Sequence, residues 1–290
     1  SVSVFINLLF LAKILFLNLK CKELMIRGFF FFIMLWITSV TSAQESTASK
    51  NVSTFTIEAP QLKTTKKIWI YLPKDYSATA KKYSVIYMHD AQNVFDAKTS
   101  FSGEWNVDEK LDSLKAPVIV VGIEHGNEKR IDELTPFKNE KYGGGNADNY
   151  LDFIVKTLKP YIDKNYRTKP KAKNTIIMGS SLGGLVSYYA ILKYPEVFGK
   201  AGVFSPAFWF SNDIYTLTEQ TPKIKTKIYF LCGDKESDDM VKDMTKMERL
   251  LDTKRCYCLH LTKSKIVKGG EHNEKLWRDG FVKAFLWLGY

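Results

Sequence analysis

Short apolar runs alternate with amphipathic stretches along most of this chain. Runs rich in β-branched and aromatic residues, bounded by Pro, Gly or Asp, predict strands. They lie at 66–73, 83–90, 116–125, 174–179, 201–206, 227–233 and about 256–267. Apolar residues spaced by three and four predict helices at 147–166, with a kink at Pro160, and at 182–194, 238–253 and 274–289. The alternation predicts an α/β fold: a mostly parallel central sheet with helices on both faces, whose functional residues follow the carboxyl ends of the strands.

The first 43 residues have a different pattern. Residues 28–40 form an apolar run that follows Arg27 and precedes the small residues of "TSA" at 41–43. This is typical of a signal peptide, here 25–43, cut after Ala43. Residues 1–24 are apolar enough for a membrane helix. We favour a leader that is not translated in the natural protein, because two adjoining hydrophobic stretches are unusual in an anchor.

These boundaries leave a short linker at 44–54 and one folded domain at 55–290. The mature protein is expected to be exported, either periplasmic or extracellular. It would meet a membrane only through an uncleaved N-terminal segment. Its oligomeric state is left open.

Composition is that of a globular protein with an enzyme-sized core, with 45% hydrophobic and 25% charged residues. The formal charge of +11 falls to +8 without residues 1–43, which hold four basic residues and one acidic residue. The excess lies mostly in lysine-rich stretches such as 63–67 and 169–173, without interleaved arginines and aromatics. We therefore expect a solvated surface and no nucleic-acid binding, with attraction to an acidic polysaccharide or envelope surface as the alternative.

Three cysteines remain beyond the leader, and an odd number argues against a disulfide framework. Cys256, Cys258 and His260 would share one face of a strand, where a metal site could be built. Buried thiols are the simpler interpretation. We expect no metal and no cofactor.

The segment 174–195 contains the candidate catalytic motif. Gly179, Ser181 and Gly183 form a G-x-S-x-G motif that directly follows a predicted strand and opens a helix. This is the setting of a nucleophile elbow, in which a tight turn exposes the central serine above the sheet. Ser181 is therefore the candidate nucleophile.

A serine nucleophile needs a base, and the base needs an orienting acid. Downstream of Ser181, His260 is expected inside an apolar strand, whereas His272 lies in a glycine-containing loop before the last helix. We therefore choose His272 as the base. Glu236 is the favoured acid and Asp234 its rival; Asp238 and Asp239 suit the N-terminus of the following helix instead.

Several motifs together resemble the putative esterase family of α/β-hydrolases. They are "MHDAQNVFD" (88–96), "VGIEHGNEKRIDELTPF" (121–137), "MGSSLGG" (178–184), "FSPAFWF" (204–210), "LCGDKES" (231–237) and "GGEHNEKLW" (269–277). That group includes esterase D, the feruloyl and acetyl-xylan esterases of carbohydrate esterase family 1, the enterochelin esterases and the mycolyltransferases. The resemblance covers about residues 55–290 and implies the α/β-hydrolase fold with a Ser–acid–His triad.

The resemblance also implies two backbone donors of an oxyanion hole, the N–H groups of Gln92 and Leu182. The family usually has glycine where this chain has Ala91, and an alanine would be strained there if the position requires a positive φ. Four further residues match family positions near the substrate pocket, although core packing accounts equally well for the two tryptophans. They are Asp90, Trp105, Arg130 and Trp209.

We therefore expect an exported serine esterase that acts through an acyl-enzyme. Only about 20 residues separate strands 201–206 and 227–233, so no large lid is expected and the serine should be open to bulky esters. Trp105, Phe208 and Trp209 could stack on a sugar or an aromatic acyl group. Acetyl or feruloyl esters of carbohydrates are favoured. A siderophore trilactone, an acyltransferase activity and a catalytically silent carbohydrate-binding protein are the alternatives.

Overall fold

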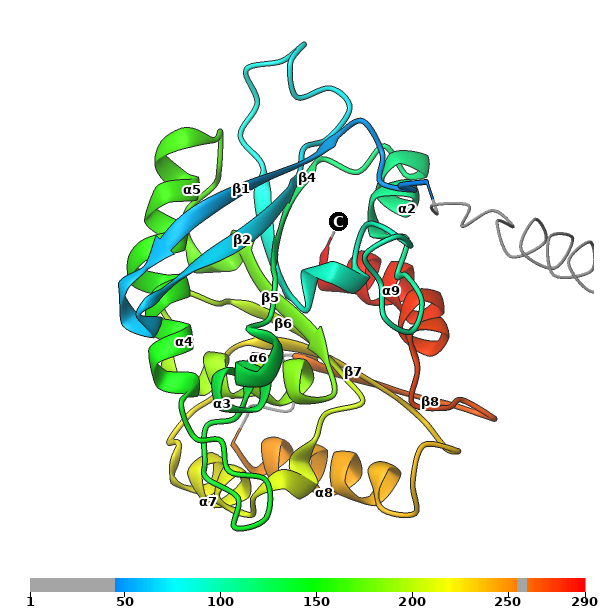
Figure 1. Ribbon diagram of the computed structural model, residues 1–290. Coiled ribbons are helices and arrows are strands. Elements are labelled where there is room, and N and C mark those ends of the chain that lie inside the picture. Colours follow the sequence, from blue (N-terminus) through cyan, green and yellow to red (C-terminus); the bar gives the residue numbers. More distant parts are fainter. Residues whose placement is uncertain (1–44, 255–259, 290) are drawn as a thin grey trace, which may run out of the picture. The chain divides into compact units, whose positions relative to one another are not determined.

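An eight-stranded sheet organises the part of the chain that the structure describes (Figure 1). The computed structural model describes residues 45–254 and 260–289, and one folded unit begins at Ser46. The strands are β1 (Val52–Ala59), β2 (Thr64–Tyr71), β3 (Ser84–His89), β4 (Val118–Ile123), β5 (Thr175–Ser180), β6 (Lys200–Phe204), β7 (Lys227–Gly233) and β8 (Thr262–Val267). Their order is β1-β2-β4-β3-β5-β6-β7-β8, and β3 to β8 run parallel. The predicted mostly parallel sheet is confirmed.

Strand β1 was not predicted, and it changes the expected domain boundary. It pairs antiparallel with β2, which in turn pairs antiparallel with β4. β1 forms the sheet edge, and of its side chains only that of Ala59 is buried. Thr47 and Ser49 also bond to the domain, so the segment 44–54, expected as a linker, is largely part of the fold.

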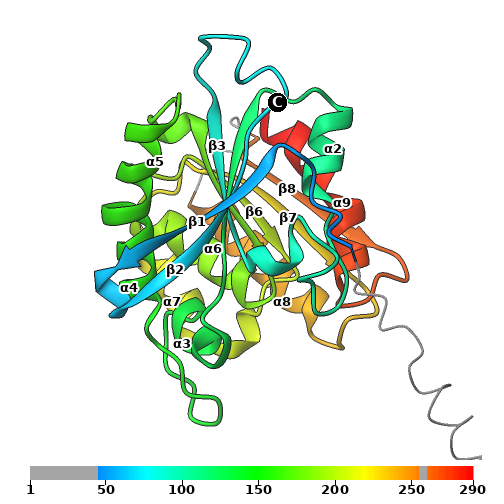
Figure 2. The ribbon, with the colours of Figure 1, turned by 45° about the horizontal axis from the view of Figure 1, so that its top comes forward.

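Helices cover both faces of the sheet (Figures 1 and 2). They are α2 (Val107–Ser113), α3 (Arg130–Leu134), α4 (Ala147–Phe153), α5 (Lys159–Asn165), α6 (Leu182–Lys193), α7 (Asp213–Gln220), α8 (Met240–Thr253) and α9 (Glu274–Gly289). Alternate residues of each central strand pack into two separate cores. The larger core contains side chains of α3 to α8, and the smaller one those of α2 and α9.

The helix predicted at 147–166 is present, with the expected irregularity before Pro160. α4 and α5 are joined by a π-helical turn at Ile154–Leu158, in which the Lys159 N–H donates to the Ile154 carbonyl. Proline has no N–H for the regular ladder, and the wider turn directly before it adjusts the bonding pattern.

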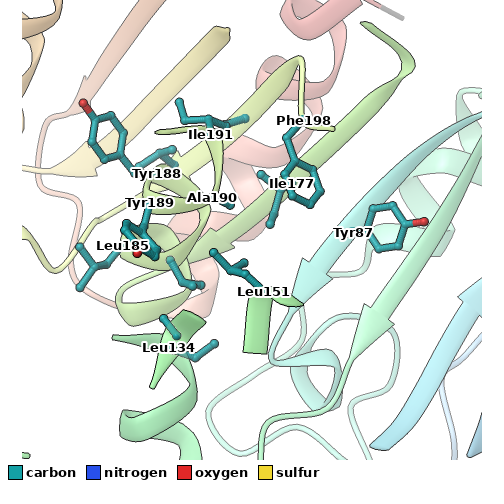
Figure 3. Packing of buried hydrophobic residues seen from close by; sticks show 14 of the residues in the cluster. Tyr87, Leu134, Leu151, Ile177, Leu185, Tyr188, Tyr189, Ala190, Ile191 and Phe198 are labelled. Atoms are coloured by element: carbon teal, nitrogen blue, oxygen red, sulfur yellow. The ribbon is translucent and has the colours of Figure 1, made fainter. Parts of the chain in front are cut away.

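Helix α6 is buried almost all round. Figure 3 shows Leu185, Tyr188 and Ile191 of α6 among the residues of the larger core, with Ile177 of β5 nearby. Burying each such side chain contributes about 1.5–3 kcal/mol. The helix that follows the G-x-S-x-G motif is thus held by packing on several sides, which fixes its first turn.

Two further expectations are corrected here. His260 does not lie inside a strand: it precedes β8, is exposed and has a φ of 42°. Cys256 and Cys258 lie outside the described residues, and so does the segment expected as signal peptide. Within the described ranges, no helix has the length and apolar character needed to cross a bilayer. Residues 205–226, between β6 and β7, hold α7, whose buried Ile214 and Tyr215 pack on the core, so no lid domain is inserted there.

Candidate active site

Ser181 occupies a sharp turn between β5 and α6. Its φ of 57° and ψ of −120° lie outside the regions that side-chain-bearing residues normally adopt. Such a conformation costs about 1–3 kcal/mol and persists only where its surroundings enforce it. Here the Ser181 N–H donates to the Phe204 carbonyl (2.9 Å), and the Ser181 carbonyl accepts from the Ala207 N–H (3.1 Å).

The motif glycines make room for this turn rather than supplying its positive φ. Neither Gly179 nor Gly183 has a positive φ, whereas Ser181 does. A Cβ on Gly179 would lie 2.8 Å from the backbone of Gly183 and 2.9 Å from the His89 ring. Only glycine permits strand and helix to approach this closely.

His272 lies in the loop before α9 and pairs with Glu236. Its Nδ1 is 2.6 Å from Glu236 Oε2. When Nδ1–H donates to this carboxylate, Nε2 of the neutral ring is left as a proton acceptor. The His272 side chain is 37% exposed and that of Glu236 is 1% exposed, so a buried acid orients a base that solvent can reach.

The other carboxylate oxygen of Glu236 accepts two hydrogen bonds. Oε1 accepts from Ser205 Oγ (2.7 Å) and from the Gly233 N–H (2.5 Å). Trp277 Nε1 donates to the same Ser205 hydroxyl (2.8 Å), and its ring meets His272 edge-on at 5.1 Å. Ser205 itself adopts a φ of 42°. These contacts fix both members of the Glu236–His272 pair.

Asp234, the rival acid, does not contact His272. It is exposed, and its Oδ1 accepts from the Gly269 N–H at 2.6 Å. Asp234 thus ties the end of β7 to the loop that carries His272. Asp238 and Asp239 lie at the start of α8, where Asp239 pairs with Lys242.

Ser181 and His272 line one cavity of about 530 Å³. It lies beyond the carboxyl ends of β3, β4 and β5, as predicted for a parallel sheet. Most of the lining residues have polar side chains, and the others are aromatic. The other lining residues are His89, Asp90, Gln92, Asn93, Thr99, Phe101, Trp105, His125, Asn127, Arg130, Ser180, Glu274 and Trp277.

Two backbone N–H groups near Ser181 have no acceptor among the described residues, those of Gln92 and Leu182. Leu182 begins α6, where the first N–H groups are left free and the helix dipole is positive. Gln92 lies in a short 3₁₀ turn after β3, fixed by Thr99 Oγ1, which donates to its carbonyl (2.7 Å). Both groups are available to a negatively charged oxygen.

Ala91 is not strained. The positive φ of this turn, 55°, belongs to Asp90, the residue before it. Ala91 is buried against Gly122 of β4, where an added Cβ would come within 2.9 Å of that of Ala91. The chain therefore accommodates alanine here because the facing strand carries glycine.

Asp90 forms a two-pronged ion pair with Arg130 in the cavity wall. Arg130 Nε lies 2.7 Å from Oδ1 and Nη2 lies 3.0 Å from Oδ2. Burial alone would raise the pKa of Asp90, but the Arg130 guanidinium holds that pKa below its usual value. Helix α3, which begins at Arg130, is fixed in turn through Glu133, which accepts from the Gly126 N–H and pairs with buried Lys66 at 2.6 Å.

His89 lies under the elbow as a neutral ring. Its Nδ1 is 2.8 Å from the Tyr150 hydroxyl, and burial lowers its pKa to about 4. It therefore carries no charge near neutral pH and does not compete with His272 as a solvent-exposed base.

Of the aromatic residues expected to stack on a ligand, only Trp105 lines the cavity. Trp105 lines the cavity but is buried, stacked on Phe204 with ring centroids 5.5 Å apart. Trp209 lies outside the cavity lining, where it packs on Tyr142 and Phe210. Phe208 is fully buried in the larger core and cannot stack on a ligand. Instead Phe101, which the sequence reading missed, lines the cavity and is 95% exposed.

Ser205 and Trp277 were also missed. Ser205 directly follows β6, so the rule that functional residues follow strands could have found it. Trp277 and Phe101 carry no such signal, because only the fold brings them to the cavity. Cys232 is a buried thiol with its pKa raised to about 12 by burial, which is a structural role.

Comparison with known proteins gives a consistent result. A family model described as "Putative esterase" matches residues 59–288. Protein YbbA of Bacillus subtilis is 28% identical over 237 residues, which cover 77% of this chain and 92% of that protein. An endo-1,4-beta-xylanase/feruloyl esterase of Xylanibacter ruminicola is 29% identical over 180 residues, or 59% of this chain, but the match spans only 23% of that longer protein.

Solved structures agree on the fold. The BES protein from Bacillus cereus superposes with a TM-score of 0.68 at 22% identity, covering 87% of this chain and all of that one. The enterobactin esterase FES from Shigella flexneri gives a TM-score of 0.70 at 18% identity, covering 85% of this chain and 60% of that one. The family model spans most of the chain, and the mostly parallel sheet superposes on solved structures over most of its length. This protein is therefore an esterase that belongs to the putative esterase family of α/β-hydrolases.

Proposed function

We propose that this esterase is a serine hydrolase that cleaves carboxylic esters through a covalent acyl-enzyme. The observation that carries the proposal is the buried Glu236 carboxylate, 2.6 Å from Nδ1 of His272, on the cavity that Ser181 also lines. A serine hydroxyl is a poor nucleophile at neutral pH, and an imidazole oriented in this way is the base that activates it.

In the proposed cycle, Ser181 Oγ attacks the ester carbonyl while His272 Nε2 accepts the hydroxyl proton. The tetrahedral oxyanion accepts hydrogen bonds from the Gln92 and Leu182 N–H groups, each worth about 10²–10³ in rate. His272 then protonates the departing alcohol. The acyl group stays on Ser181 as an ester. Water, deprotonated by His272, releases the acid and restores the serine.

We propose acetyl or feruloyl esters of carbohydrates as substrates. The cavity is open, its polar wall suits sugar hydroxyls, and Phe101 offers an exposed ring for stacking on a sugar or an aromatic acyl group. The arginine that lines the cavity, Arg130, is already paired with Asp90, and Glu274 adds a further carboxylate. The cavity therefore has no unpaired positive charge from arginine, which disfavours strongly anionic esters such as iron-loaded catecholate siderophores.

A substrate comparison tests this choice. The protein should release acetate from acetylated xylan or ferulate from methyl ferulate at least about tenfold faster, in kcat/KM, than it opens enterobactin, a difference of about 1.4 kcal/mol. Products are measured by chromatography. Preference for enterobactin would reject the carbohydrate-ester assignment; transfer of the acyl group to added sugar in place of water would identify an acyltransferase, and no turnover at all would favour a binding protein.

We also propose that the protein is exported after cleavage behind Ala43. The apolar run at 28–40, its basic flank and the small residues before Gln44 support this. Expressed from Met25 in a bacterial host, the protein should be recovered outside the cytoplasm with Gln44 as its first residue. Retention in the cytoplasm with an intact N-terminus would contradict export.

A further inference from the structure

Three carboxylates converge beside residues 47–49, and none of the three lines the active-site cavity. They belong to Glu104, Asp108 and Glu109, and one oxygen of each lies within 4.8 Å of the others. Glu104 is 4% exposed and Asp108 is fully buried. Buried acids are rare unless they are paired or bind a cation.

Each of these carboxylates is anchored through one oxygen only. Glu104 Oε2 accepts from Thr47 Oγ1 (2.9 Å), and Asp108 Oδ2 accepts from the Ser49 N–H (2.7 Å). Asn106 Nδ2 lies 3.3 Å from Glu109 Oε1. The second oxygens, Glu104 Oε1, Asp108 Oδ1 and Glu109 Oε2, are buried and accept from no donor in the part of the chain that the structure describes; Asp108 and Glu109 can bond to each other only when one of them is protonated.

No lysine or arginine of the described residues forms a direct ion pair with the cluster, although the Lys110 charge acts on Glu104 and Glu109 through space. Among residues 45–254 and 260–289, none of the three carboxylates forms an ion pair with lysine or arginine. Arg278 comes close, but its Nη1 donates to the Glu104 carbonyl (3.3 Å) and to Asn106 Oδ1 (3.5 Å). Without an ion-paired counter-charge, burying three carboxylates together is unfavourable.

We propose that Glu104, Asp108 and Glu109 form a binding site for a divalent cation, with Ca²⁺ as the preferred ion. The cluster offers only carboxylate oxygens, which suit hard cations, and it contains neither histidine nor cysteine to favour Zn²⁺. Oxygens bound to one Ca²⁺ at 2.3–2.6 Å are at most about 5 Å apart, so one ion can reach all three. Mg²⁺ requires a stricter octahedron and keeps more of its water.

A bound cation would join parts of the chain that are distant in sequence. Through Thr47 and Ser49 the cluster holds the segment before β1, and Glu104 directly precedes Trp105 in the cavity wall. Ca²⁺ would therefore stabilise the folded segment before β1, which contains Thr47 and Ser49. Through Trp105 it would also stabilise the wall of the active site. This role is separate from the esterase mechanism, which needs no metal step.

The test is calcium-dependent stability of the whole protein, first treated with EDTA and then dialysed. Adding CaCl₂ to about 100 times its dissociation constant should raise Tm by about 5 °C or more, and calorimetric titration should give one ion per chain. Tb³⁺, a calcium substitute, should luminesce when tryptophan is excited, and Ca²⁺ should displace it. MgCl₂ should raise Tm less than CaCl₂ at equal concentration.

Two variants distinguish a cation site from a purely structural cluster. Glu109→Gln and Asp108→Asn should bind Ca²⁺ at least tenfold more weakly, and in EDTA Glu109→Gln should melt at or above the wild-type Tm, because a repulsive charge is gone. Glu219→Gln, an exposed acid on α7, should keep the full calcium response. The proposal fails if wild-type Tm and Tb³⁺ luminescence are indifferent to Ca²⁺, or if Glu109→Gln responds as the wild type does.

Discussion

Ser181→Ala is expected to lower kcat/KM for p-nitrophenyl acetate by at least about 10⁴-fold, since the proposed acyl-enzyme forms on the Ser181 hydroxyl. Residual hydrolysis should come only from the oxyanion donors and from substrate binding. The variant should keep the wild-type Tm, because the Ser181 side chain makes no capping hydrogen bond and alanine places the same Cβ in the same strained turn. Initial rates and thermal unfolding check both expectations.

Ser180→Ala is the matched control. Ser180 also lines the cavity and precedes Ser181 by one residue, but it ends β5 and is buried. Its loss should change kcat/KM by no more than about tenfold. Equal losses in the two variants would mean that the turn, rather than the Ser181 hydroxyl, supports activity.

Glu236→Gln is expected to lower kcat by about 10³- to 10⁴-fold. The glutamine is nearly isosteric, so Gly233 can still donate to its carbonyl oxygen, but an amide nitrogen facing Nδ1 would favour the wrong tautomer of His272. The imidazolium formed during catalysis would also lose its neighbouring charge. KM should change little, because Glu236 is not among the residues that line the cavity.

Asp234→Asn provides the comparison. Asp234 lies two residues before Glu236, and its substitution removes the same charge. However, Asp234 accepts from the Gly269 N–H and does not contact His272. Its kcat should stay within about tenfold of the wild type. A larger loss in Asp234→Asn than in Glu236→Gln would show that the wrong carboxylate has been assigned.

The sequence predicted the sheet, most of its helices and the strand-to-helix turn at Ser181 because these depend on local patterns. Residues 228–232 are apolar throughout and are followed by Gly233, which leaves little ambiguity about this strand. β1 escaped notice because it is an edge strand with mostly exposed polar residues, so it lacks the signature of a buried strand. His260 was misplaced because apolar neighbours were taken as continuous strand.

The choice between Glu236 and Asp234 could not be made from sequence. Both follow β7 within three residues, and the decision depends on where Ser205 and Gly233 place their donors. Phe101 and Trp209 illustrate the same limit for aromatics. Exposure and position relative to the cavity arise from long-range packing, which left Trp209 outside the cavity lining and brought Phe101 into it.

The most direct measurement is mass-spectrometric mapping of the residue modified by a fluorophosphonate. We expect a single adduct, on Ser181, that forms in step with loss of esterase activity and fails to form in His272→Ala. An adduct on another residue, or full esterase activity in a protein whose Ser181 is completely modified, would contradict it.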